Sequence, residues 1–290
     1  MARGSNGNGD YPYPLIKWAG GKRGIIPQLQ ELMPDDVHPD YQGRLVEPFL
    51  GGAAVFFYLK PKEAILADMN EDLINLYMQV RDNLADVTAV LDEMGSRPYQ
   101  KETYLEVRAD EPEDLVERAA RFVFLNRWGW NGLYRVNKKG KFNVPFGATS
   151  SGEAPNLYNP QNIKAASELL KRADLRVAPF EDTMKEVTDG DFLYLDPPYH
   201  PLSATSAFTS YTKLDFSLDN QAMLRDAILE VEERTKGKAR VMLSNSVAPD
   251  LIELYERKNN LRLHTVLAFR AISAKASSRG GQPELVVTNY

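Results

Sequence analysis

Residues 191–199 read Asp-Phe-Leu-Tyr-Leu-Asp-Pro-Pro-Tyr, and this stretch decides the fold. The apolar run at 192–195 has the length and composition of a strand buried in a sheet. The run ends at Asp196, and the two prolines that follow cannot continue a strand in the middle of a sheet. In α/β proteins the carboxyl ends of parallel strands hold the ligands and the catalytic groups. The stretch therefore predicts an α/β fold with Asp196 at its functional edge.

Strand and helix patterns alternate on both sides of this stretch. Strands are expected at 44–47, 64–67, 175–178, 191–195, 240–244, 261–269 and 284–290. Helices are expected at 53–59, 72–80, 160–172, 218–236 and 248–259. This alternation is typical of a parallel sheet with helices packed on its faces.

The segment 81–155 interrupts the alternation. It is helical and rich in charge over its first half, and from 127 onward it is rich in Gly, Asn, Lys and Ser. We expect one α/β domain in two parts, 11–80 and 156–290, with 81–155 as a helical and loop insertion. The Gly- and Asn-rich residues 1–10 are expected to be a disordered tail.

The composition excludes several classes of protein. With no cysteine, the chain has no disulfide, no thiol nucleophile and no cysteine-ligated zinc, and its three scattered histidines do not suggest a metal cluster. No apolar run approaches the roughly 18 residues of a membrane-spanning helix, and the N-terminus lacks the apolar core of a secretory signal. We therefore expect a cytoplasmic protein with no metal and no membrane partner. We expect a monomer, and the sequence leaves a dimer open.

Charge is unevenly distributed along the chain. The 35 basic and 40 acidic side chains give a net charge of −5, which by itself argues against a general affinity for nucleic acid. Three windows, 11–30, 121–152 and 270–283, hold 12 of the basic residues and no acid, so the rest carries 23 basic against 40 acidic residues. The middle window also holds seven aromatic residues. Basic side chains interleaved with aromatic ones are suited to holding phosphates and stacking on bases.

The Asp-Pro-Pro-Tyr turn at 196–199 offers hydrogen-bond acceptors to an amino group. Its two prolines lack backbone N–H donors, which leaves carbonyl oxygens and the Asp196 carboxylate. An amino group conjugated to a base ring is a weak nucleophile because its lone pair is delocalised. Hydrogen bonds from its two hydrogens to Asp196 and the Pro197 carbonyl would favour a pyramidal, nucleophilic geometry, and Tyr199 would stack on the ring. The alternative interpretation is a tight turn with an incidental acid.

A second turn, Glu47-Pro-Phe-Leu-Gly-Gly-Ala53, follows the first expected strand. Its small residues would let a ligand approach the backbone beside a helix N-terminus, although a plain strand-to-helix turn has the same composition. Asp68 ends the next strand, about 20 residues downstream, where an acid commonly binds ribose hydroxyls. Together these features predict a cofactor that carries a nucleoside. Residues 17–22, Lys-Trp-Ala-Gly-Gly-Lys, lack the spacing of a Walker phosphate loop, which excludes nucleotide hydrolysis.

With these motifs in place, the chain resembles the Dam-like family of DNA adenine-N6 methyltransferases. The matching segments follow the order of the family and lie at 17–22, 46–53, 67–77, 126–147, 196–211 and in the C-terminal Arg-Gly-Gly…Glu-Leu…Asn-Tyr stretch. The resemblance implies a Rossmann-like, S-adenosylmethionine-dependent methyltransferase fold in which 81–155 is the inserted DNA-recognition domain. It also implies double-stranded DNA as the partner, with the adenine of GATC flipped out of the duplex as the methyl acceptor. Ala53 departs from the family, in which many members have glycine at this position.

The resemblance also assigns roles to individual residues. The catalytic turn would be formed by Asp196, Pro197, Pro198 and Tyr199. The S-adenosylmethionine site would comprise Trp18, Lys22, Phe49, Gly51, Gly52, Asp68, Phe180, Asp182 and Asp196. The DNA-binding residues would be Lys17, Arg127, Trp130, Asn131, Leu133, Arg135, Lys138, Lys139, Lys141 and Pro145. Among these, Trp130 matches an intercalating position, and Arg135 carries the fork that fits the two major-groove acceptors of guanine.

Two other functions were open at the level of the sequence. An amino-methyltransferase acting on RNA or on protein amides could use the same turn, but Asp rather than Asn at 196 and the basic aromatic insertion favour DNA. An inactive DNA-binding module that keeps the fold is disfavoured by the intact 196–199 turn and by the cofactor motifs.

Overall fold

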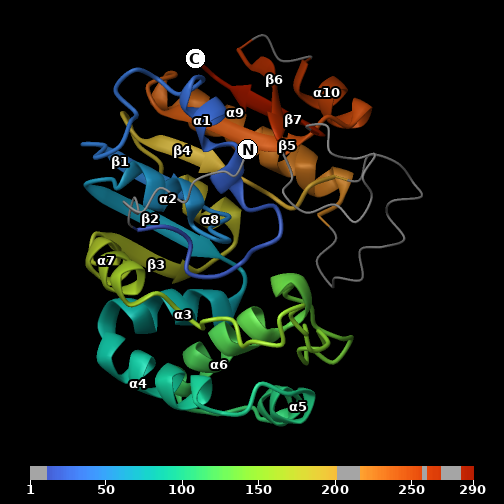
Figure 1. Cartoon of the computed structure of the whole chain (residues 1–290). Coiled ribbons are helices and arrows are strands. Elements are labelled where there is room, and N and C mark those ends of the chain that lie inside the picture. The colour runs from blue at the N-terminus through green and yellow to red at the C-terminus, as the bar shows by residue number, and fades with distance from the viewer. Residues whose placement is uncertain (1–11, 201–215, 257–259, 269–281) are drawn as a thin grey trace, which may run out of the picture.

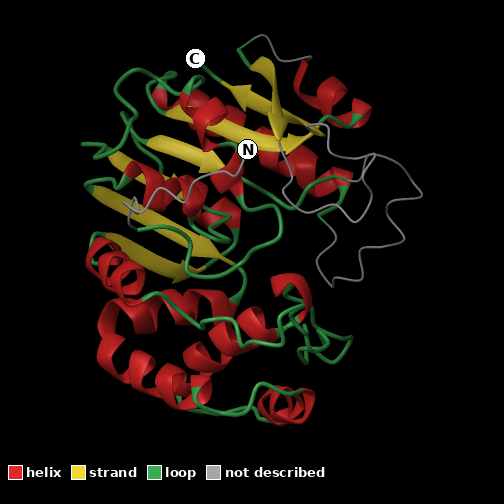
Figure 2. Ribbon diagram, in the orientation of Figure 1, coloured by secondary structure: helices red, strands yellow, loops and turns green. Residues whose placement is uncertain are grey.

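The 191–199 stretch lies at the centre of a seven-stranded sheet in the computed structural model, which describes residues 12–200, 216–256, 260–268 and 282–290. The strand order is β3-β2-β1-β4-β5-β7-β6 (Figures 1 and 2). In chain order the strands are Arg44–Glu47, Glu63–Asp68, Ala173–Val177, Phe192–Leu195, Arg240–Ser246, Arg262–Ala268 and Gln282–Thr288. The expected disordered tail at 1–10 and most of the third basic window lie outside the described residues.

Five strands of the sheet, β1 to β5, run parallel, as the alternation predicts. The expectation of a wholly parallel sheet is wrong for β7, which pairs antiparallel with both β5 and β6. The physical reason is visible in the sequence, because no helix pattern separates the last two strands. A parallel connection needs a crossover, usually a helix, whereas consecutive strands without one pair antiparallel. The sheet is therefore mixed and mostly parallel.

Helices cover both faces of the sheet (Figure 1). Neighbouring residues of β1 show the two faces, because Leu45 belongs to one apolar cluster and Val46 to the other. The Leu45 face is covered by α1 (Ile26–Gln30), α2 (Ala54–Leu59), α3 (Glu71–Asp82) and α7 (Pro160–Leu170). The Val46 face is covered by α8 (Phe180–Lys185), α9 (Leu218–Thr235) and α10 (Pro249–Glu256). Among the described residues, no helix is long and apolar enough to cross a membrane.

The segment after α3 forms a group of helices beside the sheet, below it in Figure 1. These helices are α4 (Leu84–Gly95), α5 (Lys101–Ala109) and α6 (Leu115–Trp128). α6 packs on α3 and buries its aromatic side chains, with Trp128 and Phe124 fully enclosed. The chain then leaves α6 through the short helix η2 (Trp130–Gly132) and forms an irregular hairpin, closed by bridges at Gly129–Phe146 and Val136–Phe142. We call residues 129–147 the reading hairpin, after the DNA contacts that the resemblance implies for this segment.

Candidate active site

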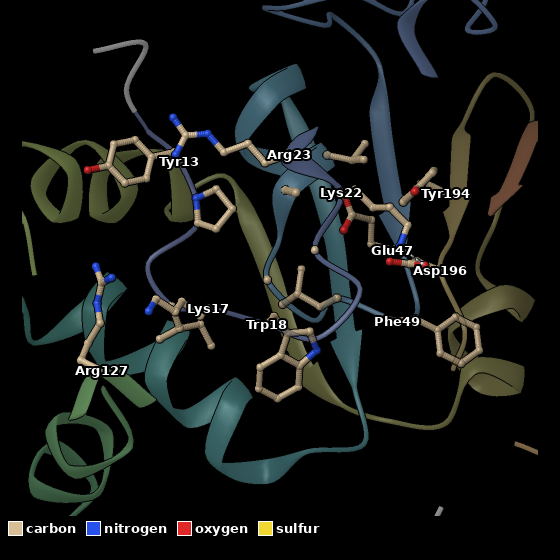
Figure 3. Close-up of a pocket in the computed structure, with 17 residues that line it drawn as sticks. Tyr13, Lys17, Trp18, Lys22, Arg23, Glu47, Phe49, Arg127, Tyr194 and Asp196 are labelled. Carbon is tan, nitrogen blue, oxygen red and sulfur yellow. Dashed lines mark ion pairs between the residues drawn. The ribbon is translucent and has the colours of Figure 1, made fainter. Parts of the chain in front are cut away.

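A cavity of about 250 Å³ opens where β1 and β4 end. Figure 3 shows its residues: Lys22, Glu47 and Asp196 gather at one end, and Lys17 and Arg127 lie at the other. Both carboxylates come from strand ends, Glu47 as the last residue of β1 and Asp196 directly after β4. The parallel register of β1 and β4 places the two strand ends side by side. The edge of the sheet predicted to be functional is therefore hollow and strongly charged.

Lys22 neutralises Asp196. The Lys22 Nζ atom lies 2.8 Å from Asp196 Oδ1, and the lysine side chain is only 4% exposed. It also donates to the Gly20 carbonyl at 2.5 Å and lies 4.7 Å from the centre of the Tyr199 ring. Burial raises the pKa of Asp196, and the ion pair with Lys22 partly offsets this by stabilising the carboxylate. Burial alone would favour the neutral acid form of Asp196. Lys22 thus acts in the opposite direction and favours the ionised form.

The Asp-Pro-Pro-Tyr turn is held from the far side by β5, β7 and α9. The Tyr199 hydroxyl donates to Glu284 Oε2 on β7 at 2.7 Å, which anchors the hydroxyl end of the ring. The Gln221 amide donates to the Pro198 carbonyl at 3.3 Å and accepts from the Asn245 amide at 3.0 Å. Burial and the nearby carboxylates raise the pKa of Tyr199, so the residue remains a neutral phenol. These hydrogen bonds tie the turn and the Tyr199 side chain to three neighbouring elements of the fold.

Glu47 is a site residue to which the sequence analysis assigned no role. It is 2% exposed, and its Oε1 atom has no hydrogen-bond partner among the described residues. Burial, followed by the charge of Asp196, holds the pKa of Glu47 well above its usual range, and the nearby backbone N–H of Phe56 in α2 offsets this only in part. A buried carboxyl oxygen without a partner is costly. In the sequence, Glu47 could have been recognised as an acidic residue at the end of an apolar strand in the centre of the sheet.

The glycine turn after β1 is tied to the end of β2. Asp68 accepts hydrogen bonds from the backbone N–H groups of Gly51 at 3.0 Å and Asn70 at 2.9 Å. Gly51 has a φ of 48°, and a Cβ atom there would lie 2.8 Å from the Trp18 ring, so both conformation and space require glycine. Ala53 also adopts a left-handed conformation, with a φ of 55°. Glycine adopts this conformation without the steric cost that alanine has there.

The expected cofactor residues fall into two groups. Those that line the cavity are Trp18, Lys22, Phe49, Gly52 and Asp196. Those that lie beyond its wall are Gly51, Asp68, Phe180 and Asp182. The Phe180 ring stacks on the Phe49 ring at 5.4 Å between centroids, which joins the two groups. Asp182 is exposed at the surface and pairs with Lys185 at 2.7 Å.

The expected DNA residues also divide by location. Lys17 and Arg127 line the cavity, and Arg127 is held there by donating to the Leu157 carbonyl at 3.1 Å. The remaining eight belong to the reading hairpin. There the backbone N–H of Trp130 donates to the Pro145 carbonyl at 2.9 Å. The Trp130 side chain is 52% exposed and that of Leu133 is 39% exposed. The other six are exposed: Asn131, Arg135, Lys138, Lys139, Lys141 and Pro145.

Arg135 and Lys141 are not free within the hairpin. Arg135 Nε donates to Asn143 Oδ1 at 2.7 Å, and its Nη2 donates to the Asn143 carbonyl at 3.2 Å. Lys141 forms an ion pair with Glu111, in the loop between α5 and α6, at 3.1 Å. Asn143 thus binds the edge of the Arg135 guanidinium that carries Nε and Nη2. The Nη1 end of the guanidinium is directed away from Asn143. Among the described residues, no group of His, Cys, Asp and Glu could hold a metal ion.

Comparison with known proteins identifies the class to which this fold and site belong. A model of the D12 class N6 adenine-specific DNA methyltransferases matches residues 18–272, and the chain belongs to this family. It is 42% identical over 96% of its length to the Type II methyltransferase M1.LlaDCHI of Lactococcus lactis subsp. cremoris, covering 95% of that protein. It is 40% identical to the Type II methyltransferase M.MjaIII of Methanocaldococcus jannaschii, over 96% of this chain and 99% of that protein.

A DNA adenine methylase of Escherichia coli strain K12 is 34% identical, over 94% of this chain and 93% of that protein. The resemblance to Dam-like enzymes, the Rossmann-like methyltransferase fold and the identification as a DNA adenine-N6 methyltransferase are confirmed. The alternatives of an RNA or protein-amide methyltransferase and of an inactive module are set aside.

Proposed function

We propose that the protein transfers a methyl group from S-adenosylmethionine to the exocyclic amine of an adenine flipped out of duplex DNA, within the sequence GATC. The observation that carries the proposal is the position of Asp196. This carboxylate lines the charged cavity, only three residues before Tyr199, and it pairs with Lys22, whose Nζ atom lies 4.7 Å from the centre of the Tyr199 ring. Asp196 thus has room beside it for a charged donor, and the nearby Tyr199 ring offers a surface on which a base can stack.

The charges at the Asp196 end of the cavity suit a cationic donor. There the Asp196 carboxylate and the Glu47 carboxyl group, which a nearby cation would help to ionise, lie beside the buried ammonium of Lys22, whereas Lys17 and Arg127 line the opposite end. S-adenosylmethionine, which when bound supplies an electrophilic methyl group on a sulfonium ion, also carries an ammonium group. A cation beside Glu47 would give its unpartnered oxygen the missing interaction. Trp18, Lys22, Phe49 and Gly52 would border this part of the donor.

The nucleoside part of the donor would extend beyond the cavity wall. Asp68 would accept hydrogen bonds from the ribose hydroxyls, next to the close approach that Gly51 allows. Phe180 and Asp182, at the start of α8, would flank the adenine ring. Phe49, which lines the cavity and stacks on Phe180, joins the two parts.

The target amine would be bound by acceptors alone. The Asp196 carboxylate and the Pro197 carbonyl would accept its two hydrogens, and the Tyr199 ring, fixed by Glu284, would stack on the base. These acceptors are in place before the substrate arrives, so little reorganisation is needed as positive charge develops on the nitrogen. Lys22 keeps Asp196 ionised for this task.

The DNA would lie over the reading hairpin and over the end of the cavity that is lined by the basic side chains of Lys17 and Arg127. Arg135 would bind guanine, Leu133 and Pro145 would contact neighbouring bases, and Trp130 would insert between base pairs. Phosphates would be held by lysines and polar groups at the rim: Lys17, Arg127, Asn131, Lys138, Lys139 and Lys141. We propose that the enzyme acts as a monomer in the cytoplasm of its cell.

Methylation of defined duplexes tests the proposal. Purified protein with methyl-labelled S-adenosylmethionine is expected to label a duplex that holds one GATC site and to spare the same duplex already methylated on both adenines. A duplex of identical composition with the site scrambled is the control. Equal labelling of the scrambled duplex would refute the GATC assignment, and absence of transfer to any duplex would refute the proposed reaction.

A further inference from the structure

One strand of the reading hairpin presents alternate side chains to opposite sides. Leu133 and Arg135, the proposed base-reading residues, are exposed, whereas Tyr134 and Val136 between and after them are half-buried. Side chains alternate along extended backbone, so Tyr134 points away from the proposed DNA surface. A displacement of the strand on either side of Tyr134 would move this residue as well.

The Tyr134 ring lies in an aromatic cluster that reaches the proposed donor site. Its centroid is 5.7 Å from that of Trp18, 5.3 Å from that of Phe122 and 5.9 Å from that of Phe142. Trp18 lines the cavity and packs so closely on Gly51 that no side chain would fit there. Tyr134 is therefore one ring away from the wall of the donor site.

Tyr134 also reaches the donor site through Asn70. The Tyr134 hydroxyl lies near enough to the polar side chain of Asn70 for the two to interact, while burial raises the pKa of Tyr134 to about 12. Asn70 caps α3 by accepting the backbone N–H of Leu73 at 3.1 Å, and its own N–H donates to Asp68 at 2.9 Å. The residue between the two proposed base-reading positions thus neighbours both Trp18 and Asn70, and Trp18 and the Asn70 partner Asp68 both adjoin the Gly51 turn of the proposed donor site.

We propose that Tyr134 is a positioning residue that couples DNA reading by Leu133 and Arg135 to the binding of the methyl donor. The inference rests on the proposed function, because it takes the hairpin as the DNA surface and the cavity as the donor site. DNA seated on the hairpin fixes Tyr134, and Tyr134 holds Trp18 and Asn70 in the arrangement that the donor needs. By linkage, the donor tightens DNA binding by the same factor.

The test measures this factor in the full-length enzyme and in three variants. The affinity of S-adenosylhomocysteine, the reaction product, is measured by calorimetry with and without a saturating GATC duplex. Tyr134→Phe removes the link to Asn70 and keeps the ring, and Tyr134→Leu removes both. Tyr99→Leu is the matched control, because Tyr99 supports the base of the hairpin through Gly147 at 2.7 Å and packs on Trp128 and Phe146 instead.

We expect the duplex to tighten binding of the product in the wild type by a factor within the usual range of about 5–150-fold. Tyr134→Leu is expected to bring this factor to within about twofold of unity, Tyr134→Phe to lower it in part, and Tyr99→Leu to leave it unchanged. If the leucine substitutions acted only through lost packing, both variants would fold less stably, and the coupling factor would not distinguish Tyr134→Leu from Tyr99→Leu. Tyr134→Phe, which keeps the ring contacts, covers the case in which Tyr134→Leu fails to fold.

Two results would overturn the inference while the proposed function stands. One is a wild-type enzyme that methylates GATC duplexes and binds the product equally well with and without DNA. The other is a Tyr134→Leu variant, or a folded Tyr134→Phe variant where the former is insoluble, with the coupling factor of the wild type. A wild-type enzyme that methylates no duplex would refute the proposed function itself, and the inference with it.

Discussion

The end of the sheet and the reading hairpin use charge in opposite ways. At the end of the sheet, Lys22 and Glu47 are almost completely buried, with 3% and 2% of their surfaces exposed. On the hairpin, Trp130 and Leu133 are 52% and 39% exposed, and the lysines face solvent. Buried charges act at low dielectric and are fixed before any ligand arrives, whereas exposed charges are screened by water and salt. Single substitutions should therefore have large effects at the first region and graded effects at the second.

The largest expected effect follows from replacing the carboxylate at the end of β4. Asp196→Asn keeps the size of the side chain but replaces one acceptor oxygen with a donor, which opposes an amine that also donates. Methyl transfer in a single turnover is expected to fall by at least about 10²–10³-fold, the usual cost of losing one preorganised group. DNA binding, measured by fluorescence anisotropy, should largely survive. Turnover near that of the wild type would remove Asp196 from the mechanism.

Asp191→Asn is the matched control at the opposite end of the same strand. Asp191 is also buried and forms an ion pair with Arg44 at 2.6 Å, but it lies at the amino end of β4, away from the cavity. This variant should unfold at a lower temperature and keep its turnover per folded molecule. An equal loss of turnover in both variants would mean that general damage to β4, rather than the chemistry of Asp196, explains the result.

The next effect is a shift in pH dependence on removal of Lys22. Burial raises the pKa of Asp196 and Lys22 lowers it, so Lys22→Met should raise this pKa further. Because the ionised form is the acceptor, activity is lost as pH falls through this pKa, and the acidic limb of the kcat profile should move to higher pH. At neutral pH the loss of the ion pair should also lower the free energy of unfolding by about 3 kcal/mol. This value is at the lower end of the range for broken buried ion pairs, because Asp196 is partly exposed.

Lys17→Met separates this effect from the loss of a positive charge in general. Lys17 belongs to the same motif and lines the same cavity, at the end away from Asp196. It should weaken DNA binding and leave the acidic limb in place. A Lys22→Met enzyme whose acidic limb coincides with that of the wild type would show that the ion pair does not set the protonation of Asp196.

An intermediate effect is expected on the hairpin from Arg135→Ala. Loss of a bidentate contact to guanine should reduce discrimination against the other bases at that position by about 1–3 kcal/mol. The ratio of kcat/KM for GATC and for duplexes with a substituted guanine measures this directly. Lys138→Ala, at the exposed tip, should instead weaken binding equally for all sequences. An unchanged ratio in Arg135→Ala would assign the readout to another residue.

The same contrast explains how much of the molecule could be predicted from its sequence. The centre of the sheet was predictable because buried strands are apolar runs with acids at their ends, as at 192–196. The direction of β7 was missed because it follows from the lack of a helix pattern between the last two strands, rather than from the pattern within either strand. The six-residue helix α8 was missed because its sequence, Phe-Glu-Asp-Thr-Met-Lys, contains no apolar run, whereas the equally short α2 is almost wholly apolar. Within the site, Asp196 stood out by its prolines, whereas Glu47 became visible only through its burial and its unpartnered oxygen.

On the hairpin, the sequence identified which residues are basic but not which of them are already bound. Arg135 is held by Asn143, and Lys141 is paired with Glu111, a residue 30 positions away in the chain. Such contacts depend on how α5 and α6 orient their connecting loop beside the hairpin, which no local pattern specifies. The exposed surface therefore contains interactions that would compete with DNA at the proposed interface.

The smallest expected effect follows from releasing one of these competing contacts. Lys141 and Glu111 are 61% and 52% exposed at a distance of 3.1 Å, and exposed pairs of this kind contribute about 0.2–1 kcal/mol. Glu111→Gln should therefore strengthen DNA binding by no more than this amount, for GATC and scrambled duplexes alike. Because one more lysine would be free to displace a counterion, the slope of log K against log salt should steepen by up to about one unit.

Glu113→Gln removes the same charge from the same loop, and Glu113 has no ion pair within the described part of the chain. It should strengthen binding less than Glu111→Gln, because it changes the field near the DNA without releasing a lysine. Equal gains in the two variants would show that the net charge of the loop, rather than the pair with Lys141, opposes DNA. A gain confined to GATC duplexes would contradict a role for Lys141 in phosphate contact, since phosphates carry no sequence information.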